Sequence, residues 1–384
     1  MTRAVVHAIT PGDHFSPRTG SAIPTVVHGQ AMASTLDPAG ARYAHRVLLE
    51  RGTFHPRYES ADIIEYDGAS WPGTAARARD AVLARVGVPR RAALQTFRPL
   101  AEALRDQPES FVLAHNAPAL PQLLRDQPHP SVLYAHNDLL RTFGPREVTR
   151  ALDPVSAIVC VSADLAERTA DQLPAHLSSR VHVVDNGVDT EQFTPSVAAR
   201  TDGRMRVMFA GRLVPDKGAD VLLDAVRMLG RDDIDVVIVG SRGFDREAAL
   251  SPYERSLREL AAGSRASVTF EPFAARPLLP ALLQTADVFV APARWAEPSG
   301  LTIGEAMATG LPVIASRVGG IPEVLGDAGI LVGADDPRSL ADALSHLADD
   351  TGARARYGVA ARARAEERDW RHSWRQLRAV LEGV

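Results

Sequence analysis

The sequence predicts an α/β protein made of two doubly wound domains, each a parallel sheet covered by helices. Short Val- and Ile-rich runs alternate with longer helical patterns, which is typical of parallel strands joined by crossover helices. The chain has 384 residues, more than one ordinary hydrophobic core accommodates. A polar stretch with turn residues, 190–203, separates the strand-forming runs into two sets and is the expected linker.

The expected elements follow in order along the chain. In the first half the expected strands are 4–9, 62–66, 111–114, 132–135, 157–161 and 181–184. In the second half they are 206–210, 236–239, 268–271, 288–291, 312–315 and 330–332. Each set is sufficient for one doubly wound sheet. From 369 to 381 apolar residues recur every three or four positions, which predicts a terminal helix.

Composition narrows the class of protein. The net charge is −4, with 45% hydrophobic and 23% charged residues, so nothing points to nucleic acid as a partner. The single cysteine, Cys160, excludes an intramolecular disulfide and is expected to be a buried apolar residue. No apolar run reaches membrane-spanning length and the N-terminus is a poor signal peptide, so we expect a cytoplasmic protein. The arginine-rich segment 74–106 is either a solvated face or a peripheral membrane contact.

Two cations lie between an expected strand and an expected helix in the second half. Lys217, the only lysine, follows Arg212 in the segment from Gly211 to Gly218. A compact ammonium and a guanidinium beside the start of a helix suit a phosphate or diphosphate. The alternative is a pair of solvated surface charges.

A second segment of the same expected sheet carries amide hydrogens and carboxylates. The N–H groups of Ser299, Gly300, Leu301 and Thr302 would point from a helix start toward an anion. Glu297 and Glu305 could each accept hydrogen bonds from adjacent hydroxyls of a sugar or ribose. Thr302 and Glu305 also fit a capping box, which needs no ligand. Because both segments follow strands of one open sheet, we expect them to meet at the same edge.

Together these residues carry a resemblance. Gly211-Arg212-x4-Lys217-Gly218 with Glu297-x7-Glu305 resembles the retaining glycosyltransferases of family 4, which have the GT-B fold. The stretches 184–195, 312–323 and 329–332 are similar to that family as well, and the resemblance is weaker over 1–150. It implies two Rossmann-like domains facing a central cleft: an acceptor-binding domain 1–197, a nucleotide-sugar domain 198–366, and a terminal helix 367–384 that crosses back.

The resemblance also implies a role for each matched residue. Arg212 and Lys217 would neutralise the departing nucleoside diphosphate, with the amides of Ser299, Gly300, Leu301 and Thr302. Glu297 would contact the donor sugar and Glu305 the ribose.

In the first half, Gly20, in the loop 16–21, would face the diphosphate. His136 would lie against the sugar, with His115 as its competitor. The implied catalytic residues are therefore His136, Glu297, Arg212 and Lys217.

The implied reaction is transfer of a sugar, with retained anomeric configuration, from a nucleotide-diphosphate sugar to a hydroxyl. UDP is the family's commonest carrier, and a glycan, a secondary metabolite or a lipid is the acceptor. No metal or cofactor is expected beyond the nucleotide sugar, since the cations stabilise the leaving group. Two alternatives stay open: a nonhydrolysing nucleotide-sugar epimerase and a non-catalytic nucleotide-sugar sensor. The sugar, the base, the acceptor and the oligomeric state are not specified by these residues.

Overall fold

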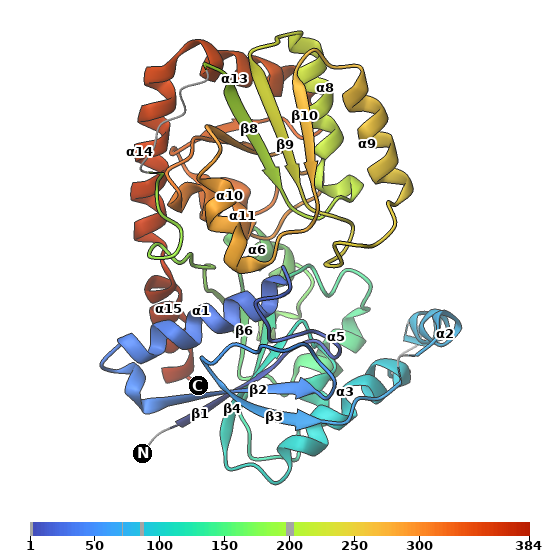
Figure 1. Cartoon of the computed structure of the whole chain (residues 1–384). Helices are drawn as coiled ribbons and strands as arrows, with labels where there is room; N and C mark the ends of the chain where they lie inside the picture. Colours follow the sequence, from blue (N-terminus) through green and yellow to red (C-terminus); the bar gives the residue numbers. More distant parts are fainter. Residues whose placement is uncertain (1–2, 71, 85–87, 197–202) are drawn as a thin grey trace. The chain divides into compact units, whose positions relative to one another are not determined.

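The computed structural model describes residues 3–70, 72–84, 88–196 and 203–384. They form two compact units, one comprising Met1–Asn186 and Trp370–Val384, the other Gly187–Asp369. Each unit has one sheet, and every described strand pair in both sheets is parallel (Figure 1). The predicted pair of doubly wound α/β domains is confirmed.

The sheet of the first unit has the strand order β3-β2-β1-β4-β5-β6-β7. Its strands are β1 Arg3–Ala8, β2 Tyr43–Glu50, β3 Asp62–Tyr66, β4 Ser110–His115, β5 Ser131–Ala135, β6 Ala157–Cys160 and β7 Val181–Val183. The order reverses between β1 and β4, which makes the carboxyl ends of these strands the expected ligand-binding edge.

Strand β2 was not expected from the sequence. His45 and Arg46 interrupt its apolar run, so the run reads as two shorter pieces. The strand tolerates His45 because another histidine, His7 of β1, hydrogen-bonds to it inside the unit. A buried polar side chain is stable when a partner satisfies it, and that partner is distant in sequence.

Helices cover the first sheet. They are α1 Ala22–Leu36, η1 Gly40–Arg42, α2 Thr74–Ala84, α3 Arg91–Leu104, α4 Leu120–Leu123, α5 Pro145–Leu152, α6 Ala163–Ala170, α7 Ala175–Ser178 and α15 Trp370–Glu382. The arginine-rich segment 74–106 spans α2 and α3, with residues 85–87 outside the described part.

The sheet of the second unit has the order β10-β9-β8-β11-β12-β13. Its strands are β8 Met205–Ala210, β9 Ile234–Val239, β10 Ser267–Glu271, β11 Val288–Ala291, β12 Val313–Ser316 and β13 Ile330–Val332. Its helices are η2 Pro215–Lys217, α8 Ala219–Leu229, α9 Pro252–Ala262, η3 Arg276–Leu278, α10 Leu279–Leu283, α11 Leu301–Ala308, α12 Ile321–Leu325, α13 Pro337–Asp349 and α14 Thr351–Glu367. All six strands expected here are present.

The division between the units lies earlier than expected. The predicted boundary at 197/198 falls outside the described residues, and the structure divides the chain between Asn186 and Gly187. Val188 and Phe193 explain the difference, because both are buried in a core cluster of the second unit. Burial of these two side chains ties the polar-looking segment to that unit.

The terminal helix α15 belongs to the first unit, and the chain enters that unit at Trp370 rather than at the expected 367. Its predicted apolar spacing places Trp374, Leu377 and Leu381 in the interior. The indole nitrogen of Trp374 donates to Asp37 at 3.0 Å, and α15 packs against α1 (Figure 1). A side chain on Gly29 of α1 would collide with the ring of Trp370, so this contact requires glycine.

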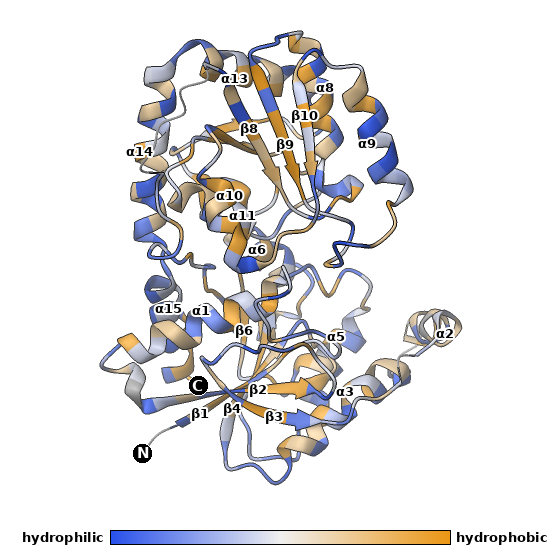
Figure 2. Cartoon of the chain, in the orientation of Figure 1, coloured by the Kyte–Doolittle hydropathy of each residue, from blue (hydrophilic) through white to orange (hydrophobic). Residues whose placement is uncertain are grey.

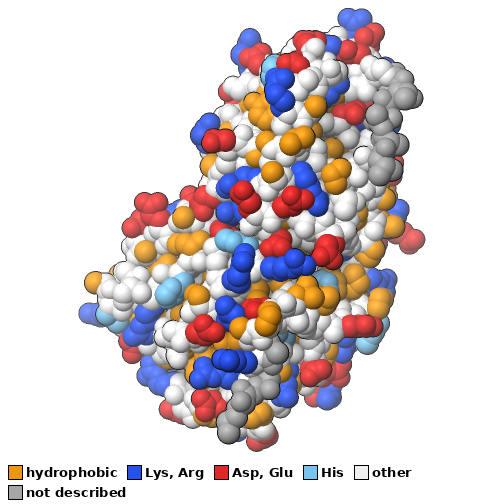
Figure 3. Space-filling model, turned by 90° about the vertical axis from the view of Figure 1, so that its left-hand side faces the viewer, with side chains coloured by type: hydrophobic (Ala, Val, Ile, Leu, Met, Phe, Trp, Pro, Cys, Tyr) orange, Lys and Arg blue, Asp and Glu red, His pale blue; other side chains and the backbone are white. Residues whose placement is uncertain are grey.

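Hydropathy follows the layers of each unit. Strand β9 is apolar along most of its length, whereas α9 carries many polar residues (Figure 2). On the face shown in Figure 3, basic and acidic side chains are interspersed. No helix in the described part of the chain is both long and apolar enough to cross a membrane.

Candidate nucleotide-sugar site

The site residues of the second unit gather at the point where its strand order reverses. Strands β8 and β11 are neighbours, with Met208 opposite Phe289. The loop after β8 carries Arg212 and Lys217, and the loop after β11 carries Glu297 and Gly300. Parallel strands bring both loops to the carboxyl edge, where open α/β sheets bind ligands. The predicted meeting of the two segments is therefore what the topology produces.

The two loops are joined by close backbone contacts. Gly218 has φ +71°, and a Cβ there would lie 1.9 Å from the carbonyl oxygen of Pro292. The backbone N–H of Arg294 donates to Asp216 O at 2.9 Å, and its guanidinium binds Asp220 at 2.6 Å and Asp335 at 2.7 Å. Arg294 was not singled out from the sequence. Arg294 fixes the distance between the loop after β8, which carries Lys217, and the loop after β11, which carries Glu297.

Lys217 and Glu297 form an ion pair through Nζ and Oε2. The indole N–H of Trp295 donates to the same oxygen at 2.9 Å, and Nζ lies 5.5 Å from the centre of that ring. The side chains are only 24% and 13% exposed. Lys217 and Glu297, which the resemblance assigns to the diphosphate and the sugar, thus lie in one cluster. In this cluster Glu297 holds the Lys217 ammonium in place.

The backbone carbonyl of Glu297 is held by two consecutive glycines, Gly319 and Gly320. Gly320 N–H donates to Glu297 O at 2.8 Å. At Gly319, φ is +56° and a Cβ would lie 2.3 Å from the same oxygen. Only a residue without a side chain allows this approach. The Gly-Gly turn after β12 therefore positions the carboxylate.

Helix α11 begins at Leu301, with Gly300 as its N-cap at φ +83°. The first N–H groups of a helix have no intrahelical acceptor and lie at the positive end of its dipole. The capping-box interpretation of Thr302 and Glu305 is wrong, because Thr302 lies inside the helix and no side chain caps it. Among the described residues no side chain caps this helix start, and binding of an anion by the amides of 299–302 stays a prediction.

Glu305 has a different partner, which the sequence did not indicate. Its Oε1 forms a 2.5 Å ion pair with Arg276 of η3, and its side chain is 4% exposed. Its other oxygen, Oε2, is buried and has no hydrogen-bond partner among the described residues. A buried carboxylate oxygen without a donor is costly. Glu305 therefore offers a free acceptor that a ligand hydroxyl could satisfy.

Arg212 differs from the other residues of the site. It is exposed, and no ion pair is found for it within the described ranges. Its carbonyl accepts from Val214 N–H at 3.0 Å, which curls the loop toward η2. An exposed guanidinium is free to approach a diphosphate from the solvent side.

Gly20 and His136 lie in the first unit. Gly20 is exposed, between β1 and α1, in a loop where Ser21 donates to Asp13 at 2.9 Å. His136 follows β5 and is 7% exposed, whereas its competitor His115, the last residue of β4, is fully buried. The two rings are hydrogen-bonded to each other at 2.8 Å. Only His136 retains surface with which to meet a ligand.

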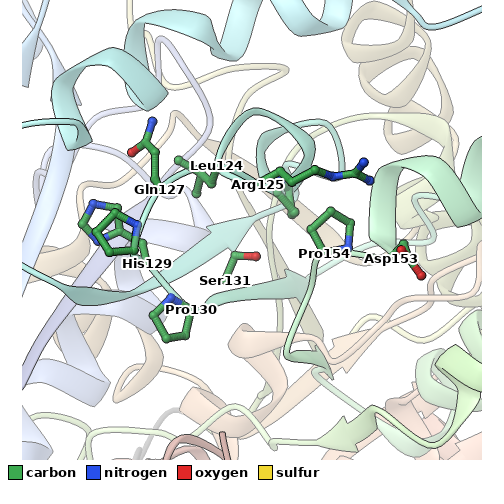
Figure 4. Close-up of a pocket in the computed structure, with 10 residues that line it drawn as sticks. Leu124, Arg125, Gln127, His129, Pro130, Ser131, Asp153 and Pro154 are labelled. Atoms are coloured by element: carbon green, nitrogen blue, oxygen red, sulfur yellow. The ribbon is translucent and has the colours of Figure 1, made fainter.

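Two cavities bear on where a ligand could bind. One of about 280 Å³ follows β10 in the second unit and is lined by Glu271, Pro272, Phe273 and neighbours from α10. The other, of about 500 Å³, is shown in Figure 4, with His129, Ser131 and Asp153 in its wall. Because Ser131 begins β5, this second cavity lies at the amino edge of the first sheet, away from the edge that carries His136.

The second unit is an open α/β sheet in which a cation, a carboxylate and an uncapped helix start gather at the reversal of strand order. The family described as "Glycosyl transferases group 1" matches residues 204–350, which lie entirely in this unit. Spore coat protein SA of Bacillus subtilis is 31% identical over 301 residues, covering 71% of this chain and 78% of that protein. The chain belongs to the group 1 glycosyltransferases.

Other relatives are named glycosyltransferases. D-inositol 3-phosphate glycosyltransferase of Xylanimonas cellulosilytica is 37% identical over 245 residues, 60% of this chain and 57% of that enzyme. The chain thus spans little more than half the length of that relative. A crystal structure of Anabaena Alr3699/HepE with UDP-glucose covers 99% of this chain and 100% of its own, with a TM-score of 0.72 and 17% identity. That likeness shows the GT-B fold.

Proposed function

We propose that this protein transfers a sugar from a nucleotide-diphosphate sugar, with UDP as the carrier, to a hydroxyl of a glycan, secondary metabolite or lipid, with retained anomeric configuration. The reaction is proposed to need neither metal nor further cofactor. The observation that carries the proposal is the Lys217–Glu297–Trp295 cluster beside the open N-terminus of α11. It combines a cation for the leaving diphosphate with a carboxylate for sugar hydroxyls.

Charge at the leaving group gives this cluster its proposed chemistry. Breaking the anomeric bond places negative charge on the diphosphate, and preorganised N–H and cationic donors stabilise that charge. Lys217, now paired with Glu297, would exchange part of that contact for phosphate oxygens. Glu297 would then turn to the sugar, while Arg212 approaches from solvent.

The nucleoside end has its own support. The unsatisfied Oε2 of Glu305 suits a ribose hydroxyl, and Arg276 fixes the carboxylate through Oε1. The cavity at Glu271–Phe273 is the proposed place of the base. UDP as carrier is favoured by the Anabaena protein of the same fold, whose structure holds UDP-glucose.

In the first unit, Gly20 and His136 are assigned to the diphosphate and the sugar, as the family resemblance implies. Contact of the segment 74–106 with an anionic membrane surface belongs to the lipid-acceptor version of the proposal. A flotation assay with vesicles containing anionic lipid would test that version.

The only lysine permits a direct test of the donor site. An amine-reactive reagent can modify only Lys217 and the α-amino group, and mass spectrometry separates the two products. We expect UDP and UDP-sugars to slow acylation of Lys217 at least tenfold, without changing the rate at the α-amino group. GDP and ADP serve as competing carriers, and a lack of protection by all three nucleotides would remove the proposed site.

Turnover distinguishes the alternatives. Product from an acceptor panel, with the anomeric configuration read by NMR, identifies a retaining transferase. Formation of a new sugar epimer from the nucleotide sugar without an acceptor would instead identify an epimerase. Binding of the nucleotide sugar without any reaction would identify a sensor. Lys217→Arg is the matched control for Lys217→Ala, because it keeps the positive charge and changes its geometry.

A further inference from the structure

Four histidines form a continuous hydrogen-bonded chain across the first sheet. His45 Nδ1 contacts His7 Nε2 at 2.9 Å, His7 Nδ1 contacts His115 Nε2 at 3.0 Å, and His115 Nδ1 contacts His136 Nε2 at 2.8 Å. Their exposed fractions are 7%, 0%, 0% and 7% from His45 to His136. We call these residues the histidine chain.

The strand register builds the histidine chain. His45 lies opposite Val5, two residues before His7, and His7 lies opposite Leu113, two residues before His115. His115 lies opposite Tyr134, two residues before His136. Each step to the next strand moves two residues toward the carboxyl edge, which keeps all four side chains on one face of the sheet.

The hydrogen bonds between the rings restrict the histidine chain to two arrangements of its protons. A neutral imidazole has one N–H and one acceptor nitrogen, and each contact needs one of each. All four rings must therefore donate in the same direction along the chain. Burial lowers the pKa of His45 to about 4 and that of His136 to about 3, and it lowers the pKa of His7 and His115 as well. The rings are thus neutral near pH 7.

The two ends of the histidine chain are not equivalent. His45 Nε2 is buried and has no hydrogen-bond partner among the described residues. If the rings donated toward His45, this nitrogen would carry a buried N–H without an acceptor, the rarer defect in folded proteins. If they donate toward His136, the buried end is only an unused lone pair. The proton then sits on Nδ1 of His136, which, unlike Nε2 of His45, is not a buried atom without a partner.

We propose that His45, His7 and His115 are positioning residues that hold His136 as its Nδ1–H tautomer. His136 then presents a neutral hydrogen-bond donor at the carboxyl edge of the first sheet. Because Nε2 of His136 is occupied by His115, Nδ1 is the only ring nitrogen left for a ligand. The backbone is fixed too: His136 N–H donates to Asn116 Oδ1 at 2.8 Å.

The use of that donor rests on the proposed function. A donor that stays neutral can bind a sugar hydroxyl or a diphosphate oxygen without introducing a buried charge. In the histidine chain each hydrogen bond polarises the next ring, which strengthens the Nδ1–H of His136 as a donor. His136 is the residue that would touch substrate, and the other three act through it.

The tautomers can be read without substrate. In protein with ¹⁵N-labelled histidine rings, long-range ¹H–¹⁵N spectra identify the protonated nitrogen, and single His→Gln variants assign each signal. We expect Nδ1–H for all four members of the histidine chain. His129 is the built-in control with the opposite form, because its Nδ1 accepts from Ser110 N–H at 3.2 Å and its Nε2 donates to Leu104 O at 3.0 Å. An Nε2–H signal from His136 beside a normal His129 would overturn the proposal.

A pair of variants tests the transmission. His115→Asn keeps an N–H donor near the position of Nδ1, whereas His115→Phe removes it. We expect Asn to preserve Nδ1–H at His136, and Phe to release it to a mixture of tautomers with a fall in kcat of about tenfold and little change in KM for the nucleotide sugar. Equal losses of kcat in both variants, with the His136 tautomer unchanged, would show that the chain only packs.

Failure of the proposed function has a separate signature. If the wild-type protein binds no nucleotide, the proposed donor site is refuted. The tautomer spectra are recorded without substrate, so they still test the histidine proposal separately. If His115→Phe does not fold, seen as loss of the His129 signals, the wild-type spectra still decide the proposal.

Discussion

The four buried histidines make the stability of the first unit depend strongly on pH. Folding keeps them neutral, with pKa values lowered by burial to about 4 for His45 and about 3 for His136, and also lowered for His7 and His115. In the unfolded chain a histidine titrates near pH ~6.5. The unfolded state therefore binds more protons below pH ~6.5, so stability is complete above this value and falls as the pH drops toward the folded pKa values.

The expected loss follows from linkage. Each such histidine costs about 1.4 kcal/mol per pH unit once the pH is below its unfolded pKa, so one histidine costs about 1.4 kcal/mol between pH ~7.5 and ~5.5. Four of them amount to about 5–6 kcal/mol. That is comparable with the whole stability of many domains. We therefore expect the first unit to be near its unfolding threshold at pH ~5.5.

Tryptophan fluorescence can follow this unit by itself. The four tryptophans are Trp71, Trp295, Trp370 and Trp374; Trp370 and Trp374 lie in the first unit, Trp295 lies in the second, and Trp71 is outside the described residues. In a Trp295→Phe background, urea unfolding at several pH values should lose about 5 kcal/mol over this range. His45→Gln should remove about a quarter of the loss. His182→Gln, at an exposed position of β7, is the matched control.

Two results would refute the reasoning. A loss below about 1.5 kcal/mol would mean that no more than one histidine is neutral and buried. Equal changes of the pH dependence in His45→Gln and His182→Gln would mean that the dependence does not arise in the histidine chain.

Further predictions concern single residues. Lys217→Ala and Glu305→Ala should each lower turnover at least ~100-fold with the fold intact, because they lose transition-state or donor contacts; near-normal steady-state kinetics in either would contradict the site. Gly319→Ala should lower kcat/KM by ~10-fold or more and also lower the urea midpoint, since its Cβ would press on Glu297 O at a positive φ; an unchanged kcat/KM would show that this turn does not position the carboxylate. Trp374→Ala should destabilise the first unit by about 3–5 kcal/mol, as expected for a large side chain with no exposed surface, and calorimetry should show the second unit unaffected.

Local patterns predicted the parts of the site that lie close together in sequence. Lys217 stands out because it is the only lysine, and Gly300 because it lies in the short loop before an expected helix start. The periodicity of Val- and Ile-rich runs predicted almost every strand, since parallel strands are buried on both faces. These features depend on neighbours within a few residues, and such neighbours are visible in the sequence.

Partners distant in sequence could not be predicted in the same way. Arg276 reaches Glu305 from another loop, Arg294 joins two loops, and His45 is stable inside a sheet because His7 binds it. Strand β2 was missed for the same reason.

The sequence by itself determined the two-domain α/β class, the cation and carboxylate loops, and the family to which the chain belongs. The tertiary structure alone decided which atoms those groups bind: Glu297 holds Lys217, Glu305 keeps one oxygen without a partner among the described residues, and four histidines line up across neighbouring strands. The reason is physical. Side-chain spacing along one strand or helix is set by local geometry, whereas strand register and loop contacts arise only when the whole core packs.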